Sequence, residues 1–314
     1  MGRLAKTPVP QRFPLPSLPG WVRLYAAVQT MDEAALRAGA AIAMLDARVR
    51  AEVPFAGVWR RRLALKAAAA SAKIARRGED EAMLRDAFFL RHGNDDPGPA
   101  GRMLLAWRAL DRSTALDDNA VLHVADILNL KVDDGLRAAI ARAQQIAVSN
   151  CGAPFAAAET ARVVLTHRPD AEILAPWLAD AVLATRLKWK LSLPLLASAL
   201  LHPSLRGTRR RPCPGDSNWK LSCTLAYARA AAQACDLFAE LEHNAQKLVA
   251  VTARLRAKGA AAVIEQLHNE DAVLPSARIG AMSDRGLRRL FDRLVALGAV
   301  RELTGRSTFR LYGL

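Results

Sequence analysis

Apolar residues recur at intervals of three and four through most of the chain, which is the spacing of helices with one buried face. The first such stretch starts where Thr30 and Glu33 form a capping box, and it continues to Val49. The same spacing predicts further helices over 55–77, 80–91, 99–110, 117–129, 134–149, 154–167, 170–188 and 217–258. Strict alternation of apolar and polar residues is confined to the last fifteen positions. The pattern therefore predicts a mostly α protein in which a multi-helix bundle precedes a different C-terminal unit.

Residues 260–314 have the pattern of three helices and a β-hairpin. A helix over 260–268 is followed by a short helix that Pro275 opens, and Ser283 caps a third helix. The buried stripe expected for the third helix consists of Leu287, Leu290, Phe291, Leu294 and Leu297. Strands are expected over 300–303 and 308–312, with Phe309 and Leu311 facing one side and Arg310 the other. This order predicts a small winged helix-turn-helix.

The third helix of this unit carries its arginines mainly opposite the apolar stripe. In a winged helix-turn-helix such a helix enters the major groove of DNA, where arginine contacts guanine, and the hairpin lies near phosphate or the minor groove. The residues that we expect to contact DNA are Ser283, Arg285, Arg288, Arg289, Arg293, Arg306 and Arg310. Two alternatives stay open, because winged helices also bind proteins and exposed arginines are often only solvated.

The chain has three predicted regions. Residues 1–20 hold five prolines and no apolar run, which indicates a flexible lead-in and not a signal peptide. Residues 21–258 form the helical bundle, whose role the pattern does not indicate. Gly259 separates the bundle from the winged helix-turn-helix over 260–314.

Composition and charge narrow the choice of partner. Hydrophobic residues make up 52% of the 314 positions, which excludes a wholly disordered chain. The net charge of +15 favours a polyanion, and double-stranded DNA fits the predicted tail best. The longest uncharged stretch, 191–205, is too short for a membrane span of about 20 residues. We therefore expect a soluble, cytoplasmic protein with no membrane partner; a homodimer stays open.

Residues typical of common catalytic sites do not form any familiar motif. The four cysteines, Cys151, Cys213, Cys223 and Cys235, make no C-x-x-C pair, and the six histidines are scattered. No H-E-x-x-H, G-x-S-x-G, P-loop or G-x-G-x-x-G sequence is present. We expect no metal and no cofactor, and an enzymatic activity is less expected than binding.

Two other basic segments are candidates for contacts with nucleic acid or for ion pairs. A secondary basic patch gathers in the loop that precedes the long Ala-rich helix. Its members are Arg206, Arg209, Arg210, Arg211 and Lys220. Arg60, Arg61 and Arg62 lie together on one helix, and we expect one of them to pair inside the bundle, with Asp86 or Glu81 as the candidate acids.

The most polar interior stretch is the turn over 91–102. A catalytic interpretation places a phosphate at the helix start, with Arg102 as its clamp and His92 or Asp95 as acid–base. The residue types are remotely similar to the Fic nucleotidyl-transfer motif, although the order and spacing differ and the aromatic residue of that motif is absent. The alternative, which we favour, is a turn in which Asp96 caps the next helix.

Several segments resemble the domain of unknown function 1403 family of rhizobia and related α-proteobacteria. They are WRRRLALKAAAASAKIARRGEDEAMLRDAFFLRHGNDDPGPAGRMLLAWRAL, LADAVLATRLKW, LAYARAAAQACDLFAEL and MSDRGLRRLFDRLVALGAVRELTGRSTFRLYGL. The resemblance implies a bacterial, cytoplasmic protein that is often carried on plasmids or mobile regions, and it supplies no catalytic residues. A similar tail ends a related group of helix-turn-helix proteins, which favours DNA by analogy.

The sequence thus predicts a DNA-binding regulator of transcription or plasmid maintenance that acts through its C-terminal winged helix. An enzyme for a nucleotide or phosphate ligand at 91–102, or a protein-binding adaptor, are the alternatives.

Overall fold

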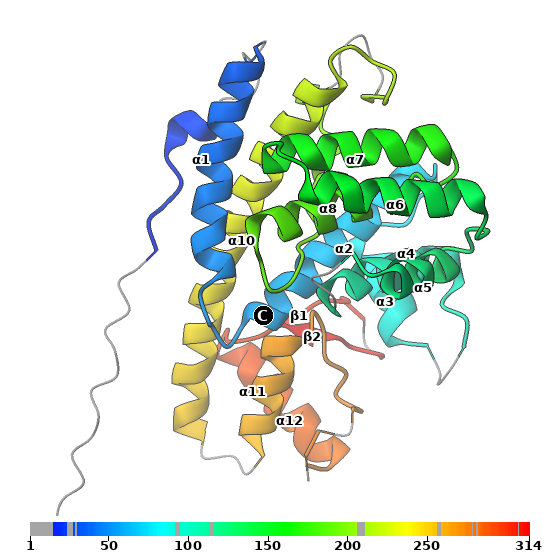
Figure 1. The fold of residues 1–314 in the computed structure, drawn as a ribbon. Coiled ribbons are helices and arrows are strands. Elements are labelled where there is room, and N and C mark those ends of the chain that lie inside the picture. Colours follow the sequence, from blue (N-terminus) through cyan, green and yellow to red (C-terminus); the bar gives the residue numbers. More distant parts are fainter. Residues whose placement is uncertain are drawn as a thin grey trace, which may run out of the picture.

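The computed structural model describes residues 15–23, 28, 30–91, 95–112, 116–205, 211–255, 259–277, 279–280, 282–306 and 308–314. The protein is mostly helical, as predicted (Figure 1). Its α-helices are α1 (Met31–Val49), α2 (Ala56–Ile74), α3 (Glu81–Phe89), α4 (Gly98–Ala109), α5 (Asp118–Ile127), α6 (Asp134–Val148), α7 (Ala153–His167), α8 (Leu174–Leu187), α9 (Leu196–Leu200), α10 (Trp219–Leu255), α11 (Ala260–Asn269) and α12 (Asp284–Ala296). Strands β1 (Arg301–Glu302) and β2 (Tyr312–Gly313) pair antiparallel.

Side-chain caps begin several of these helices where the sequence predicts a start. The Thr30 hydroxyl accepts a hydrogen bond from the Glu33 amide at 3.4 Å, which confirms the capping interaction predicted for the start of α1. Asp80 and Asp133 accept from amides three residues later, each at 2.9 Å, at the starts of α3 and α6. Capping satisfies amides that have no partner within the helix, so these termini are fixed locally.

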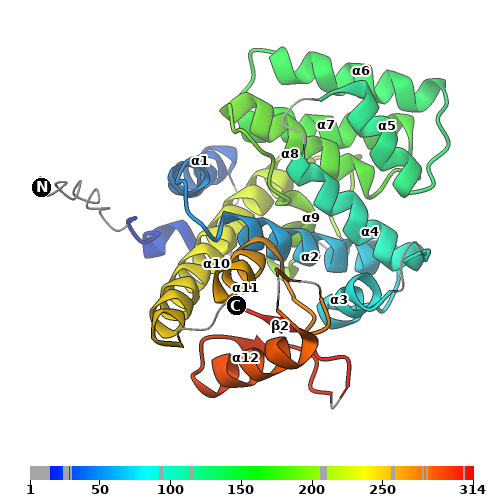
Figure 2. The same ribbon diagram turned by 90° about the horizontal axis from the view of Figure 1, so that it is seen from below.

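The bundle is built around α2, which lies at its centre with helices on several sides (Figures 1 and 2). Four consecutive alanines, Ala67 to Ala70, are all buried in α2, and their small side chains let neighbouring helices approach closely. The helices α1 and α10 lie side by side along one flank, and α6, α7 and α8 form a group on another. The Ala-rich composition therefore serves close helix packing.

Buried tryptophans tie helices together through their indole N–H groups. Trp107 donates to the Ser71 hydroxyl at 2.8 Å, and Trp59 and Trp177 donate to the carbonyl oxygens of Ala234 and Ala106 at 3.0 Å. A buried indole N–H without a partner would cost free energy, so each bond also fixes the ring. The few aromatic residues thus connect α2, α4, α8 and α10.

The acidic side chain of Asp180 on α8 is buried in the core. Its carboxylate accepts hydrogen bonds from the amides of Leu195 and Leu196 at 2.7 and 3.1 Å, at the start of α9, and from the Tyr227 hydroxyl at 3.1 Å. Burial raises the pKa of Asp180 to about 8, although these hydrogen bonds oppose the shift. The sequence predicted no helix over Leu196–Leu200, and Asp180 was not among the predicted functional residues.

The C-terminal region departs from the prediction at three places. The predicted helix opened by Pro275 is absent from the described residues there, which form turns over 275–277. Leu297, expected in the buried stripe, follows the last turn of α12 and is 47% exposed. Phe309 is 66% exposed and has a φ of 54°, in the left-handed region. Phe309 therefore does not share a side with the buried Leu311, and only Tyr312 of the strand predicted over 308–312 belongs to β2.

A buried ion network joins this region to the bundle. Asp271, only 2% exposed, pairs with Arg85 of α3 at 2.6 Å and with Arg62 of α2. Glu270 pairs with Arg108 of α4 at 2.7 Å. The hydrophobic core is continuous across Gly259, since the buried residues of α12 and β2 belong to the same cluster as those of α2.

Candidate nucleic-acid interface

The helix α12 is amphipathic and lies at the outer edge of the molecule (Figure 2). Ser283 caps it as predicted, because its hydroxyl accepts from the Gly286 amide at 3.3 Å. Leu287, Leu290, Phe291 and Leu294 are buried, so four of the five residues predicted for the stripe are in the core. The Phe291 ring stacks on Tyr312 of β2, with centroids 4.5 Å apart and planes 10° apart. These contacts fix which face of α12 meets solvent.

The solvent face of α12 carries four guanidinium groups. Arg285, Arg288, Arg289 and Arg293 are all exposed. Within the part of the chain that the structure describes, no acidic side chain forms an ion pair with any of them. Asp284 and Asp292 share the exposed side, so this face has a formal excess of positive charge. Free, solvated arginines on a fixed helix are able to pair with phosphate or with base edges.

The two hairpin arginines are in different surroundings. Arg306 forms an ion pair with Asp86 of α3, so the hairpin touches the bundle through this residue. Arg310 is exposed, and its Nε donates to the Arg306 carbonyl oxygen at 3.0 Å. A nucleic-acid contact by Arg306 would require it to leave Asp86 or to contact both groups.

The described members of the secondary basic patch already have partners. Arg211 pairs with Glu172, and the Lys220 ammonium lies 4.4 Å from the centroid of the Phe155 ring. Arg206, Arg209 and Arg210 lie outside the described residues. The two described cations therefore do not form a free basic surface of the kind found on α12.

The 91–102 turn is held together by its own ion pair. Arg102 pairs with Asp96 at 2.8 Å, and the Gly98 amide donates to the same carboxylate at 3.0 Å. The Arg102 guanidinium holds the pKa of Asp96 below its ordinary value. Asp95 is exposed, and His92 lies outside the described residues. Arg102, the predicted phosphate clamp, thus pairs with an acid of the same turn, whereas the N-cap of α4 is Pro97 and not the predicted Asp96.

The three consecutive arginines of α2 all pair inside the protein. Arg60 and Arg61 pair with Asp111, Arg61 at 3.3 Å, and Arg62 pairs with Asp271. The predicted partners were wrong, since Asp86 pairs with Arg306 and Glu81 with Lys66. The sequence did not point to Asp111 or Asp271 as partners, although an Arg triplet in a buried helix signals that matching acids must lie nearby.

Comparison with known families gives one result that covers almost the whole chain. The family described as Protein of unknown function (DUF1403) matches residues 7–314. The chain belongs to this family. The resemblance found in the sequence is therefore confirmed, and α12 and the ion network fall within the DUF1403 region.

No curated protein matches the chain. Among the described residues, no helix of this DUF1403 protein has the length and apolar character needed to cross a membrane.

Proposed function

We propose that this protein binds double-stranded DNA through α12 and acts as a regulator of transcription or plasmid maintenance. The observation that carries the proposal is the solvent face of α12, where Arg285, Arg288, Arg289 and Arg293 are exposed without acidic partners among the described residues. The opposite stripe is buried, so the helix presents these groups in a fixed direction. A fixed helix with projecting arginines suits the major groove.

We further propose that residues 260–314 are a winged helix-turn-helix in which turns replace the middle helix. Val273, which follows α11, supports this proposal because it forms a β-bridge with Tyr312 of β2. Strand β2 also pairs with β1. A single bridge after the first helix to the last strand, and a hairpin after the recognition helix, make a compact support for that helix. In this arrangement α12 is the recognition helix and the segment between β1 and β2 is the wing.

Each residue has a role in this proposal. Arg285, Arg288 and Arg289 approach base edges or phosphates from the first turns of α12, and Arg293 holds the backbone farther along. The amide end of the helix at Ser283 favours a phosphate. Arg310 and Arg306 contact the backbone from the wing, and Arg306 exchanges Asp86 for a phosphate.

The alternatives have less support. A protein-binding adaptor calls for a neutral or acidic α12 face, whereas four arginines and two aspartates are exposed there. An enzyme at 91–102 would need a phosphate to displace Asp96 from Arg102, although that carboxylate also accepts a hydrogen bond from the Gly98 amide. We propose a cytoplasmic protein, since its four cysteines are unpaired, as is usual in a reducing compartment. We also propose a homodimer, because many regulators with this fold bind two DNA half-sites as dimers.

Fluorescence anisotropy of the full chain on a mixed-sequence duplex, across a salt series, tests the proposal. We expect log K to fall linearly with log salt concentration. The double variant Arg288→Gln/Arg289→Gln should bind more weakly, and its slope should be shallower by about 0.9 for each phosphate that it no longer neutralises. The matched control is Arg137→Gln/Arg142→Gln on the exposed side of α6, which removes the same charge and lies far from α12 (Figures 1 and 2).

The control should keep the wild-type affinity and slope. Equal reductions in affinity for both double variants would show that charge alone drives binding and would reject α12 as the contact. Absence of binding at low salt would reject the DNA proposal.

A further inference from the structure

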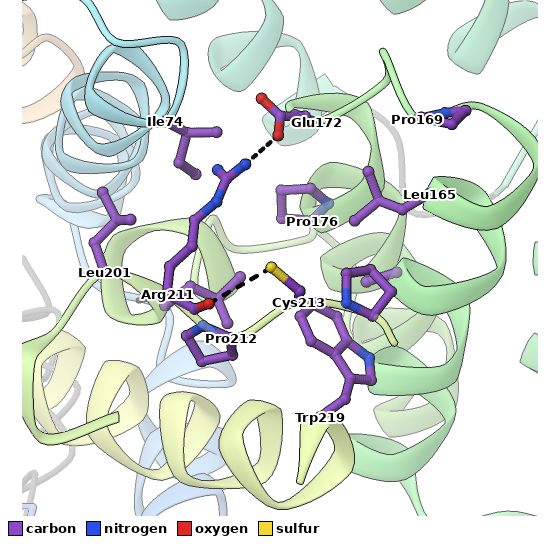
Figure 3. Close-up of a pocket in the computed structure, with 13 residues that line it drawn as sticks. Ile74, Leu165, Pro169, Glu172, Pro176, Leu201, Arg211, Pro212, Cys213 and Trp219 are labelled. Carbon is purple, nitrogen blue, oxygen red and sulfur yellow. Dashed lines mark hydrogen bonds and ion pairs between the residues drawn. The ribbon is translucent and has the colours of Figure 1, made fainter. Parts of the chain in front are cut away.

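A cavity of about 280 Å³ is lined by residues from the end of α2, from α7, from the first turn of α8 and from the start of α10. Figure 3 shows its walls, with Ile74 of α2 and Leu201 on one side of the Arg211 side chain, and Leu165 of α7 and the indole of Trp219 at the start of α10 on the other. Its size is just below that of common ligand pockets, which measure about 300–1,000 Å³. The cavity suits a compact ligand with a hydrocarbon body.

The polar groups of this cavity are few and come from two segments. The Arg211 side chain extends across it to the Glu172 carboxylate, and the two form an ion pair (Figure 3). The Cys213 thiol also lines it and donates to the Arg211 carbonyl oxygen at 3.6 Å. An apolar cavity crossed by one guanidinium and its carboxylate partner therefore offers a single charged anchor.

The Arg211 end of this ion pair is held in place by the chain around it. Pro212 and Pro214 restrict the backbone on either side of Cys213, and the Cys213 amide donates to the Asp216 carboxylate at 2.8 Å. A guanidinium stays charged at every physiological pH and binds a carboxylate through two parallel hydrogen bonds. The Arg211 side chain is 39% exposed, so an incoming carboxylate is able to reach the guanidinium that Glu172 occupies in its absence.

We propose that this cavity binds a small apolar carboxylate. The ligand carboxylate replaces that of Glu172 on Arg211, and its hydrocarbon part lies against Ile74, Leu165 and Trp219. Glu172 is partly exposed, with 37% of its side-chain surface accessible, so its carboxylate becomes hydrated when the ligand displaces it. This site is independent of DNA binding and goes beyond the function proposed above.

Isothermal titration calorimetry of the full chain with hexanoate tests the proposal, with hexan-1-ol and hexylamine as probes that have the same hydrocarbon chain. Hexanoate should bind at least tenfold more tightly than either. Arg211→Gln should remove this preference, while Glu172→Gln should tighten hexanoate binding because it removes the competing carboxylate. The matched control is Arg162→Gln, which breaks the surface pair of Arg162 with Glu159 on α7 and should leave hexanoate binding unchanged.

A chemical readout locates the bound ligand. Cys213 lines the cavity and Cys151 does not, and both thiols are partly exposed. Hexanoate should slow the alkylation of Cys213 by iodoacetamide at least severalfold and leave Cys151 unaffected. The proposal is overturned if hexan-1-ol or hexylamine binds as tightly as hexanoate, if hexanoate shows no binding at millimolar concentration, or if Glu172→Gln weakens its binding. Circular dichroism checks that each variant keeps the wild-type helix content.

Discussion

Replacing Asp271 by asparagine should destabilise the whole fold, because it leaves two buried arginines without their counter-ion. The Asp271 carboxylate is 2% exposed and pairs with Arg85 and Arg62, which come from different helices. Removing one partner of a buried ion pair typically costs about 3–5 kcal/mol, since the remaining charge stays desolvated. Asparagine keeps the size of the side chain, so the loss of stability measures charge and not a cavity.

This loss of stability converts into a shift of melting temperature. The entropy of unfolding is about 2.1 cal/mol/K per residue, or about 0.66 kcal/mol/K for 314 residues. A destabilisation of about 3–5 kcal/mol should then lower Tm by about 5–8 °C. Differential scanning calorimetry measures this shift directly, and it also shows whether 260–314 melts with the bundle or in a separate transition.

The matched control is Asp236→Asn, because Asp236 also pairs with an arginine but at the surface. Its partner is Arg23, at 2.6 Å, and the two side chains are 55% and 40% exposed. A surface pair contributes about 0–1 kcal/mol, so the control should shift Tm by no more than about 1.5 °C. Equal shifts for both variants would refute the argument that burial makes the Asp271 network important.

Three further predictions follow from particular side chains. Asp180→Asn should remove a pH dependence of stability, because the pKa of Asp180 is raised to about 8 in the native state, which keeps a proton that the unfolded chain releases above about pH 4. The free energy of unfolding of the wild type should therefore fall as pH rises from about 4 to 8, by at most ~1.4 kcal/mol per pH unit. A Tm difference between the two proteins that does not grow with pH would contradict this. Phe291→Ala should lower the free energy of unfolding by about 3–5 kcal/mol, as measured by chemical denaturation, because the ring is buried against Tyr312. Phe309→Ala, at an exposed position, should change it by no more than about 0.5 kcal/mol. Similar destabilisation by both would be evidence against the assigned packing. Arg289→Ala should weaken binding to a selected cognate site by about 1–3 kcal/mol more than to random DNA, as measured by anisotropy, and equal weakening on both duplexes would exclude a base-specific contact.

Much of the fold could be predicted from local pattern, because helix boundaries depend on nearby residues. Thr30 and Ser283 cap helices through amides three residues later, and such contacts are visible in sequence. The buried stripe of α12 was also predictable, apart from Leu297 beyond its last turn.

Features set by distant contacts were not predictable in the same way. Asp271 meets arginines about two hundred residues earlier in the chain, and only the fold brings them together. Phe309 follows the alternation of a strand, yet its left-handed backbone turns it to solvent. The cavity beside Arg211 likewise forms where helices from separate parts of the sequence converge.

Oxidative footprinting of the full chain with and without duplex DNA tests the central claim most directly, because it locates the contact. Met282 precedes the cap of α12 and Phe309 is exposed on the proposed wing, while Leu36 of α1 and Val148 of α6 are exposed on other helices. The account predicts that DNA protects Met282 and Phe309 from oxidation and leaves Leu36 and Val148 unchanged. Protection of Leu36 or Val148 without protection of Met282 would contradict the assignment of α12 as the DNA-binding helix.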